Sequence, residues 1–581
     1  AVGLMDAADK RTDPSVGSHG AASPSLSPHS QPRAVSSKSD IEAHSQAEED
    51  AILDITEEHN AADQNNTPGL KRALHGRHLR FLALGGGIGT GLFVGTGNIL
   101  STGGPGSMII NFILLAIMMV TVIFAIGELV SLFPVAGAYT TMLTRFVDPS
   151  LGFAISLNYV LTWLIILPVE LTAITIVIGY WVDDDTVPKG VWIAIVLVVV
   201  FTINLFGTRT FGEAEFFATT VKMAALVGFI ICGIVIVCGG TPSDRYLGAH
   251  TWHDPGAFAN GFKGFCSVFV YGAFSFGGSE LVGLAAAEAA EPRKQLPRAC
   301  KMVAWRVSIF FVLALFIMSL IVPYNDSHLL GSSSNPRASP FVIAIQIGQI
   351  RALPHVFNAA ILTSVISMSN SAVYAASRLL VGMAENRHLP AILAYTDRKG
   401  RPLPALVVVF LFGLLAFLIY SASEGEIFSW LVGISGLSII FMWGTICAAH
   451  LRFRRAWRLR GHTLRELPWC SPMGVWGSWF GMVLNMLLLA GNFYYSAFPI
   501  GEGEMTGQQR AHDFFENMIS AVIVLFSFLM HKLITRSHIV RIDEIDLDTD
   551  RRDPVSQEVL DRERAEEAAK PMWLRVLNIF I

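Results

Sequence analysis

One stretch of 47 consecutive residues, 81–127, contains no Asp, Glu, Lys or Arg. A helix crosses the hydrocarbon core of a bilayer with about 20 mostly apolar residues, so this stretch is long enough for two crossings. The whole chain agrees, because 52% of its 581 residues are hydrophobic and only 15% are charged, against about 25% charged residues in typical soluble domains. These features exclude an ordinary water-soluble globule and predict a protein of the lipid bilayer.

Comparable apolar segments recur along the chain, separated by glycines, prolines and clusters of charge. They are apolar on most faces instead of alternating with a period of two, which predicts membrane helices and not the strands of a barrel. We therefore expect an all-α integral membrane protein with twelve transmembrane helices. The twelve expected spans are 81–100, 108–134, 151–181, 189–206, 216–239, 262–285, 302–323, 354–382, 404–421, 426–450, 473–494 and 513–535.

The basic residues of the membrane part fall on alternate loops. The loop after the tenth span contains six arginines between residues 451 and 465, and the loops after the sixth and eighth spans are also basic. Because Lys and Arg in short loops stay on the cytoplasmic side, this asymmetry predicts that both termini are cytoplasmic. The acidic loops after odd-numbered spans, such as Val182-Asp-Asp-Asp185, are expected outside.

Composition divides the chain into three parts. Residues 1–75 are rich in Ser, Asp, Glu, Gln and His and are expected to form a disordered cytoplasmic tail. Residues 76–535 form the membrane domain, residues 536–581 form a second cytoplasmic tail, and both tails are candidate docking sites for cytoplasmic regulators. The formal net charge of −4 combines two acidic tails with a basic membrane domain, so it gives no reason to expect a nucleic-acid partner.

The glycine-rich segment Gly85-Gly-Gly-Ile-Gly-Thr-Gly-Leu-Phe93 lies inside the first span. Each glycine costs about 1 kcal/mol in a helix interior, so five glycines in seven positions predict a break in this helix. A broken membrane helix exposes amide groups that attract a carboxylate and carbonyls that attract an ammonium group or a cation. Close helix packing is an equally good interpretation, because four of the glycines form pairs with the four-residue spacing of small residues at helix contacts.

A second glycine pair interrupts the sixth span at Phe274-Ser-Phe-Gly-Gly-Ser-Glu280 and is followed by an acidic residue. The first and sixth spans are five apart, as expected if two five-helix halves each begin with a broken helix. This pairing favours a functional role for both breaks over simple helix packing.

Among the ionisable residues inside the spans we single out four, because a charge there is expensive and is therefore functional by default. They are Glu128, Glu170, Lys222 and Glu280. Glu128 and Glu170 lie nearer to span ends or Pro breaks, so we expect a gating or structural role for them at least as much as a transport role. Lys222 lies seven positions into the fifth span and can load and release a proton if burial disfavours its charged form. A fixed cation, paired with a carboxylate or with carbonyls, is the alternative.

Other chemistry is sparse in this sequence. In the eighth span, Ser364, Ser367 and Ser371 share one helix face, which lines a pathway or hydrogen-bonds another helix. The six cysteines show no metal-ligand spacing, and the chain has no zinc-protease, phosphate-loop or nucleophile-elbow motif. We therefore expect no enzyme, no cofactor and no metal site. Asn325, in a sequon of an expected external loop, is a candidate glycosylation site.

Several motifs are specific when they are taken together. They are Gly86-Gly-Ile-Gly-Thr-Gly-Leu-Phe93, Gly127-Glu-Leu-x-x-x-Phe-Pro134, Gly212-Glu-Ala-Glu-Phe-Phe217, Phe274-Ser-Phe-Gly-Gly-Ser-Glu-Leu-Val-Gly283 and Ala287-Glu-Ala-Ala-Glu-Pro-Arg-Lys294. With these motifs the chain resembles the fungal amino-acid permeases of the amino acid-polyamine-organocation superfamily, and it is most similar to the general amino-acid permease type. The resemblance extends from about Leu70 to the tail sequence Asp546-Leu-Asp-Thr-Asp-Arg-Arg552.

The resemblance implies twelve helices in a five-plus-five inverted repeat, with helices 1 and 6 broken and two trailing helices. It implies a symporter that imports amino acids with protons across the plasma membrane by alternating access, with broad specificity. The implied substrate-binding residues are Ile88, Gly89, Thr90 and Gly91 in helix 1 and Phe274, Ser275, Phe276 and Gly277 in helix 6. Lys222 matches a position that is linked to proton coupling in relatives, and Glu280 matches an acidic position that is common in the superfamily. We expect both residues to take part in proton coupling. An amino-acid-sensing receptor of the same fold with little transport is the alternative.

Overall fold

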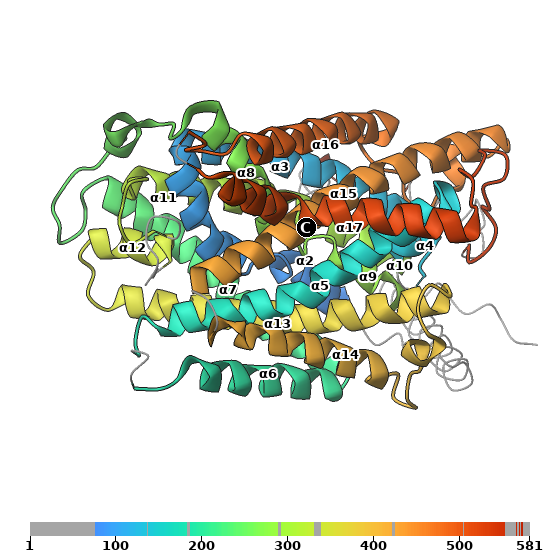
Figure 1. Ribbon diagram of the computed structural model, residues 1–581, viewed down its shortest axis with the longest axis horizontal. Helices are drawn as coiled ribbons and strands as arrows, with labels where there is room; N and C mark the ends of the chain where they lie inside the picture. Colours follow the sequence, from blue (N-terminus) through green and yellow to red (C-terminus); the bar gives the residue numbers. More distant parts are fainter. Residues whose placement is uncertain are drawn as a thin grey trace, which may run out of the picture. The chain divides into compact units, whose positions relative to one another are not determined.

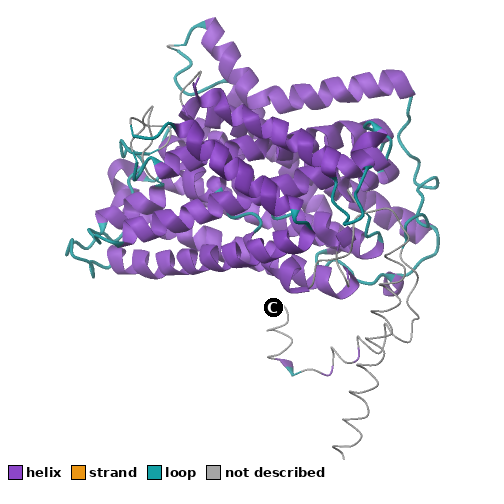
Figure 2. Cartoon of the chain, turned by 90° about the horizontal axis from the view of Figure 1, so that it is seen from below, coloured by secondary structure: helices purple, strands orange, loops and turns teal. Residues whose placement is uncertain are grey.

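The computed structural model describes residues 76–135, 138–182, 186–288, 292–329, 339–420, 424–503 and 505–551, together with positions 565, 569, 571 and 572. Every regular element in these residues is a helix, and long helices run side by side through the bundle (Figures 1 and 2). The predicted all-α fold is therefore confirmed. The expected amino-terminal tail, residues 1–75, and the acidic loop 183–185 lie outside the described residues.

Among the described residues, ten helices are long and apolar enough to cross a membrane, which makes the chain a multi-pass membrane protein. They are Gly91–Leu132, Pro149–Ile178, Thr208–Val237, Gly261–Leu284, Gln295–Ile321, Leu353–Glu385, Leu403–Tyr420, Ile427–Leu459, Gly474–Ala497 and Gly507–Thr535. A shorter apolar helix, Lys189–Leu205, lies where the fourth span is expected. The count of twelve spans and the inverted repeat stay predictions.

The α-helices of the described residues are labelled as in Figure 1. In chain order they are α2 (Gly76–Gly85), α3 (Thr96–Leu132), α4 (Ala138–Phe146), α5 (Pro149–Ile178), α6 (Lys189–Leu205), α7 (Thr208–Val237), α8 (Gly261–Phe276), α9 (Leu281–Leu284), α10 (Pro292–Arg306), α11 (Val312–Ile321), α12 (Pro340–Ile347), α13 (Leu353–Glu385), α14 (Leu403–Gly413), α15 (Glu424–Leu459), α16 (Gly474–Ala497) and α17 (Gly507–Thr535). Two π-helical segments, Gly91–Gly95 and Val307–Phe311, lead into α3 and α11.

The helix α3 is interrupted at Gly104, whose φ of 77° and ψ of 169° are not helical. Glycine adopts a positive φ readily, and Pro105 lacks the N–H that a helix interior needs. A Cβ on Gly104 would lie 2.7 Å from the backbone nitrogen of Ala259, so the segment before α8 packs directly on this turn. The interruption falls between the expected end of the first span at 100 and the expected start of the second at 108.

The helix α5 is the central element of the bundle and packs against α13, α15 and α17 (Figure 1). Its side chains are buried on nearly every face, which explains why its sequence is apolar all round. The helices α6, α16 and α17 instead expose apolar side chains, among them Val198 at 58%, Leu487 at 63% and Leu533 at 74% exposure. Such faces suit hydrocarbon as their surroundings, so we expect them to contact lipid.

The first part of the carboxy-terminal tail, residues 537–551, packs against the bundle. Ile545 and Leu547 are fully buried. Asp546 accepts hydrogen bonds from the backbone N–H groups of Asp548 and Thr549. Burial raises the pKa of Asp546, but hydrogen bonds from Thr549 and the backbone outweigh it and hold the pKa at about 2. The Asp546 carboxylate therefore keeps its charge far below neutral pH.

Basic residues of α4, of α15 and directly after α15 hold this tail segment in place. The guanidinium group of Arg145 lies 2.7 Å from the Asp550 carboxylate and donates to the Thr549 carbonyl oxygen. Arg452 donates to the carbonyl oxygen of Val540, and Arg460 donates to that of Ile545. The tail is thus fixed largely through its main chain.

We expect the double substitution Ile545→Ala and Leu547→Ala to release the tail, because removing a buried Leu or Ile side chain costs about 2–5 kcal/mol. Limited trypsin digestion of the purified protein should then cut the segment around Arg541 and Arg551 faster than in the wild type. Ile539→Ala, at a position that is 61% exposed, is the control and should not change the rate. Equal cleavage of the double variant and the wild type would contradict the docking.

Candidate functional site

The first predicted break is present in the structure. The helix α2 ends at Gly85, and π-helical structure begins at Gly91. The turn between them is fixed by hydrogen bonds from the N–H of Gly86 to the Leu82 carbonyl and from the N–H of Ile88 to the Gly85 carbonyl, at 2.8 and 2.9 Å. The segment that follows begins at Gly91. No preceding helical turn supplies a hydrogen-bond acceptor to its first amide groups.

The second predicted break separates α8, which ends at Phe276, from α9, which begins at Leu281. Gly278 has a φ of 90°, a conformation that only glycine adopts without strain. This positive φ explains why the sequence has a glycine at this break.

The two breaks touch through their backbones. A Cβ on Gly278 would lie 2.3 Å from the carbonyl oxygen of Gly86, and a Cβ on Gly91 would lie 2.6 Å from the Cα of Ser275. A Cβ on Gly87 would lie 3.2 Å from the carbonyl oxygen of Gly277. Glycine is thus needed at these positions so that the two broken helices can approach each other.

The aromatic residues of the second break face different surroundings. The Cδ1 atom of Phe274 lies 3.1 Å from the position of a Cβ on Gly91, so this ring contacts the first break. Phe276 instead packs with Phe112 and Phe311, at ring-centroid distances of 5.3 and 5.5 Å. Ser275 donates its hydroxyl hydrogen to the Tyr271 carbonyl within its own helix.

Buried side chains donate hydrogen bonds to three carbonyl groups at the first break. Arg306 donates to the Ala83 carbonyl, Lys222 donates to the Gly85 carbonyl at 3.1 Å, and Ser364 donates to the Ile88 carbonyl at 2.9 Å. The three donors come from α10, α7 and α13.

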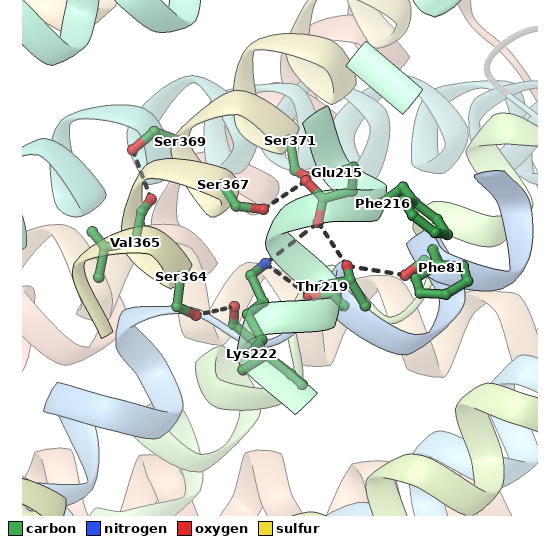
Figure 3. A network of polar contacts seen from close by, with 12 residues as sticks. Phe81, Glu215, Phe216, Thr219, Lys222, Ser364, Val365, Ser367, Ser369 and Ser371 are labelled. Carbon is green, nitrogen blue, oxygen red and sulfur yellow. Dashed lines mark hydrogen bonds and ion pairs between the residues drawn. The ribbon is translucent and has the colours of Figure 1, made fainter. Parts of the chain in front are cut away.

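Lys222 is fully buried and belongs to a polar network between α7 and α13 (Figure 3). Its Nζ lies 3.3 Å from Oε1 of Glu215. The other carboxylate oxygen of Glu215 accepts hydrogen bonds from Ser367 at 2.6 Å and Ser371 at 3.3 Å. The polar stripe of the eighth span therefore contacts both the first break and the carboxylate beside Lys222.

Glu170 lies against the first break and not at a helix end. A Cβ on Gly89 would lie 3.1 Å from Oε1 of Glu170, and the residue is only 1% exposed. Thr90, which is also fully buried, lies beside this carboxylate and interacts with it through its hydroxyl and its backbone N–H. Glu170 therefore lies at the first break and pairs with one of its residues.

Glu280 is fully buried directly after the second break. The Tyr159 hydroxyl donates to its Oε1 atom at 3.0 Å, and the Tyr139 hydroxyl donates to its backbone carbonyl. Within the described residues, its Oε2 atom has no hydrogen-bond partner. Tyr139 belongs to α4, so this short helix reaches the second break.

Glu128 belongs to a different cluster, which joins α3 to α15 and to the segment before α16. Its carboxylate lies 2.5 Å from the guanidinium group of Arg454 and 3.1 Å from the His450 ring. It also accepts a hydrogen bond from the Ser471 N–H at 2.7 Å. A carboxylate satisfied on this many sides fits the structural alternative.

Several buried ionisable residues in helices were not among the four predicted from the sequence, and three of them lie in the helices that surround the first break. These three are Glu215, Arg306 and Arg378. Glu215 fell one residue before the expected span at 216, although it shares a helix face with Thr219 and Lys222 at spacings of four and seven. Arg378 lies inside the expected eighth span and pairs with Glu288 at 2.9 Å. Its side chain is buried, which the sequence pattern did not indicate.

The remaining predicted sites lie away from the breaks. Asn325 is exposed in the turn after α11, as a glycosylation site requires. The six cysteines form no disulfide within the described residues, and three of them, Cys266, Cys300 and Cys447, are buried.

Comparison with known proteins decides the family. The family model for amino acid permeases matches residues 78–544, which include both breaks and the polar network. The chain belongs to the amino acid permease family. The resemblance seen in the motifs is therefore confirmed for nearly the whole membrane domain.

Several relatives of this permease match it over most of both chains. The general amino-acid permease GAP1 of Saccharomyces cerevisiae is 46% identical over 88% of this chain and 86% of its own. Amino acid transporter 1 of Schizosaccharomyces pombe is 48% identical over 84% of each chain. The cationic amino acid transporter 1 of the same organism is 45% identical over 88% of this chain and 86% of its own.

We expect Gly91→Ala to reduce amino-acid uptake by about 5- to 150-fold, because the added methyl group meets the backbone of Ser275 and overpacking costs about 1–3 kcal/mol. The measurement is uptake of a labelled amino acid at matched surface abundance. Gly95→Ala is the matched control, since a Cβ there would lie 3.7 Å from the Thr90 carbonyl oxygen, which is an ordinary van der Waals contact. Wild-type uptake in the Gly91 variant would show that close approach of the breaks is not required.

Proposed function

We propose that this permease is a proton-coupled importer of amino acids at the plasma membrane, with broad specificity and alternating access around the two breaks. The family supports amino-acid transport. The single observation that supports the coupled mechanism best is the contact between Lys222 and the Gly85 carbonyl, because it links a buried ionisable group directly to the first break.

The substrate is recognised chiefly through its α-carboxylate and α-ammonium groups. The amides that begin the segment at Thr90 and Gly91 bind the carboxylate, since the start of a helix attracts an anion. The ammonium group is held by main-chain carbonyls and by Glu170, whose buried carboxylate lies beside Gly89. Phe274 closes over the substrate, because its ring contacts the first break, whereas Phe276 belongs to another aromatic cluster.

The proton is carried by Lys222, with Glu215 as its partner, while Glu280 serves the second break. A buried charge is costly unless it is paired, and loss of one partner from a buried pair is strongly unfavourable. Protonation of Lys222 therefore favours the arrangement in which its ammonium group contacts both the Gly85 carbonyl of the first break and the Glu215 carboxylate. The fixed-cation alternative has the same contacts, so it must be distinguished by experiment.

The twelve-helix fold and the five-plus-five repeat form part of this proposal. The interruption at Gly104 divides Gly91–Leu132 into the end of one span and the whole of the next. The 17-residue α6 is just long enough for a thin crossing. The basic loops then face the cytoplasm together with both termini.

Broad specificity is proposed because main-chain groups read what all amino acids share. Relatives whose names differ in specificity, the general permease and the cationic transporter, are almost equally similar to this chain. Overall identity therefore does not select a substrate, and uptake competition against the twenty amino acids measures it directly.

We expect Lys222→Ala to abolish accumulation of amino acid driven by a pH gradient in proteoliposomes, while exchange of external for internal substrate continues. The reason is that exchange needs no net proton movement. Lys532→Ala is the matched control, because Lys532 also pairs with a carboxylate, that of Asp148 at 2.8 Å, far from either break in sequence. Accumulation by the Lys222 variant at the wild-type level would leave only the fixed-cation role.

Flux through the wild-type protein separates the alternatives for the chain as a whole. A proton-coupled carrier should concentrate a labelled amino acid when the outside is acidic, and the gradient should dissipate when a protonophore is added. An amino-acid receptor should bind the substrate without flux. Flux that never exceeds the external concentration would reject proton coupling but not amino-acid transport.

A further inference from the structure

A cavity of about 540 Å³ lies between the carboxy-terminal end of α15 and the beginning of α16. Both helices are labelled in Figure 1. The α15 wall supplies four arginines, the α16 wall supplies apolar and aromatic side chains, and Ile542 of the docked tail completes the lining. The volume is in the range of about 300–1,000 Å³ that is typical of small-molecule sites. The cavity is on the side of the basic loops and separate from the Lys222 network.

The charge of this cavity is uncompensated. Its lining contains Arg452, Arg454, Arg455 and Arg458 but no acidic residue. Arg454 is neutralised by Glu128, and Arg452 donates to neutral carbonyl groups. Arg455 and Arg458 are exposed and have no hydrogen-bond or ion-pair partner in the part of the chain that the structure describes.

The spacing of these arginines brings their positive charges close together, so that they repel one another when no anion is bound. Arg452, Arg455 and Arg458 follow each other at three-residue intervals and so lie along one face of α15, where like charges repel. An anion bound between them removes this repulsion and gains charge-assisted hydrogen bonds from the guanidinium groups.

The opposite wall of the cavity is suited to hydrocarbon. Trp479 and Met482 line it from α16, and Trp479 is 49% exposed. The exposed apolar face continues along the helix through Val483 and Met486, which are 56% and 63% exposed. Trp476, at 84% exposure near the start of α16, is the kind of side chain that marks the interface between membrane and water.

We propose that this cavity binds an anionic phospholipid, with the headgroup between Arg455 and Arg458 and an acyl chain along Trp479 and Val483. Basic pockets between membrane helices on the cytoplasmic side recognise anionic headgroups in this way, and the cytoplasmic leaflet supplies such lipids. The proposal uses the orientation given under the proposed function but not the transported substrate.

The test titrates phosphatidylserine or phosphatidylcholine into the purified full-length protein in neutral detergent and follows the unfolding midpoint. Binding to the folded state raises the midpoint according to the affinity. Phosphatidylserine should stabilise the wild type and phosphatidylcholine should not. In the double variant Arg455→Gln and Arg458→Gln the affinity for phosphatidylserine should fall about 30-fold, since each basic residue near an anionic surface contributes a factor of about five.

The matched control is Arg245→Gln with Arg351→Gln, which removes the same charge from two exposed arginines in other loops and should leave the affinity unchanged. Without lipid, the control variant should unfold at the wild-type midpoint because its two side chains are exposed. The Arg455 and Arg458 variant should unfold at or slightly above that midpoint, because it removes like-charge repulsion on α15. Met482→Asp provides an independent check and should also weaken phosphatidylserine binding by placing a charge on the hydrocarbon wall.

Three results would overturn the proposal. The first is equal binding of phosphatidylserine by the wild type and the Arg455 and Arg458 variant. The second is equal binding of phosphatidylcholine and phosphatidylserine by the wild type. The third is an equal rise of the midpoint with inorganic phosphate, which would indicate a soluble anion as the occupant. Since binding is measured without flux, failure here leaves the transport proposal untouched, and failure of transport leaves this measurement valid.

Discussion

Lipid hydrocarbon supplies no hydrogen-bond donor to the carbonyl groups of the broken first helix, and buried side chains at the centre of this permease supply donors instead. An unpaired backbone group in hydrocarbon costs several kcal/mol. Arg306, Lys222 and Ser364 reach the break from three different helices. Ser339, before α12, adds a fourth contact at the Phe93 carbonyl. The arrangement of α7, α10 and α13 around helix 1 follows from this need as much as from apolar packing.

This constraint gives Lys222 two tasks in the proposed mechanism. Its ammonium group satisfies a main-chain carbonyl, and its charge is balanced by Glu215, which Ser367 and Ser371 hold on the neighbouring helix. A change at any member of the set alters the others, because interactions within one polar network are not additive. Structural support and chemical coupling are therefore properties of the same contacts.

The sequence predicted the features that are written in local residue patterns. The two glycine clusters indicated both breaks, and long uncharged stretches indicated the helices, because backbone entropy and membrane thickness act on short segments. Glu215 was missed because its burial depends on Ser367, more than 150 residues away in the chain. The placement of Glu170 beside Gly89 likewise depends on how α5 packs against helix 1, for which periodicity carries no signal. The docking of Ile545 and Leu547 was also beyond reach, since the acidic composition of the tail favours solvent.

The contact between Gly86 and Gly278 has a consequence for genetics. The obstacle that a side chain would meet at Gly278 is the main chain of Gly86, at 2.3 Å, and no substitution at position 86 can make the main chain smaller. Where two side chains collide, a second mutation at the point of contact commonly compensates. A mutation at position 86 cannot compensate for a side chain at position 278 in this way. Revertants of a defect at Gly278 should therefore restore glycine itself, and selection should yield no second-site suppressor at position 86.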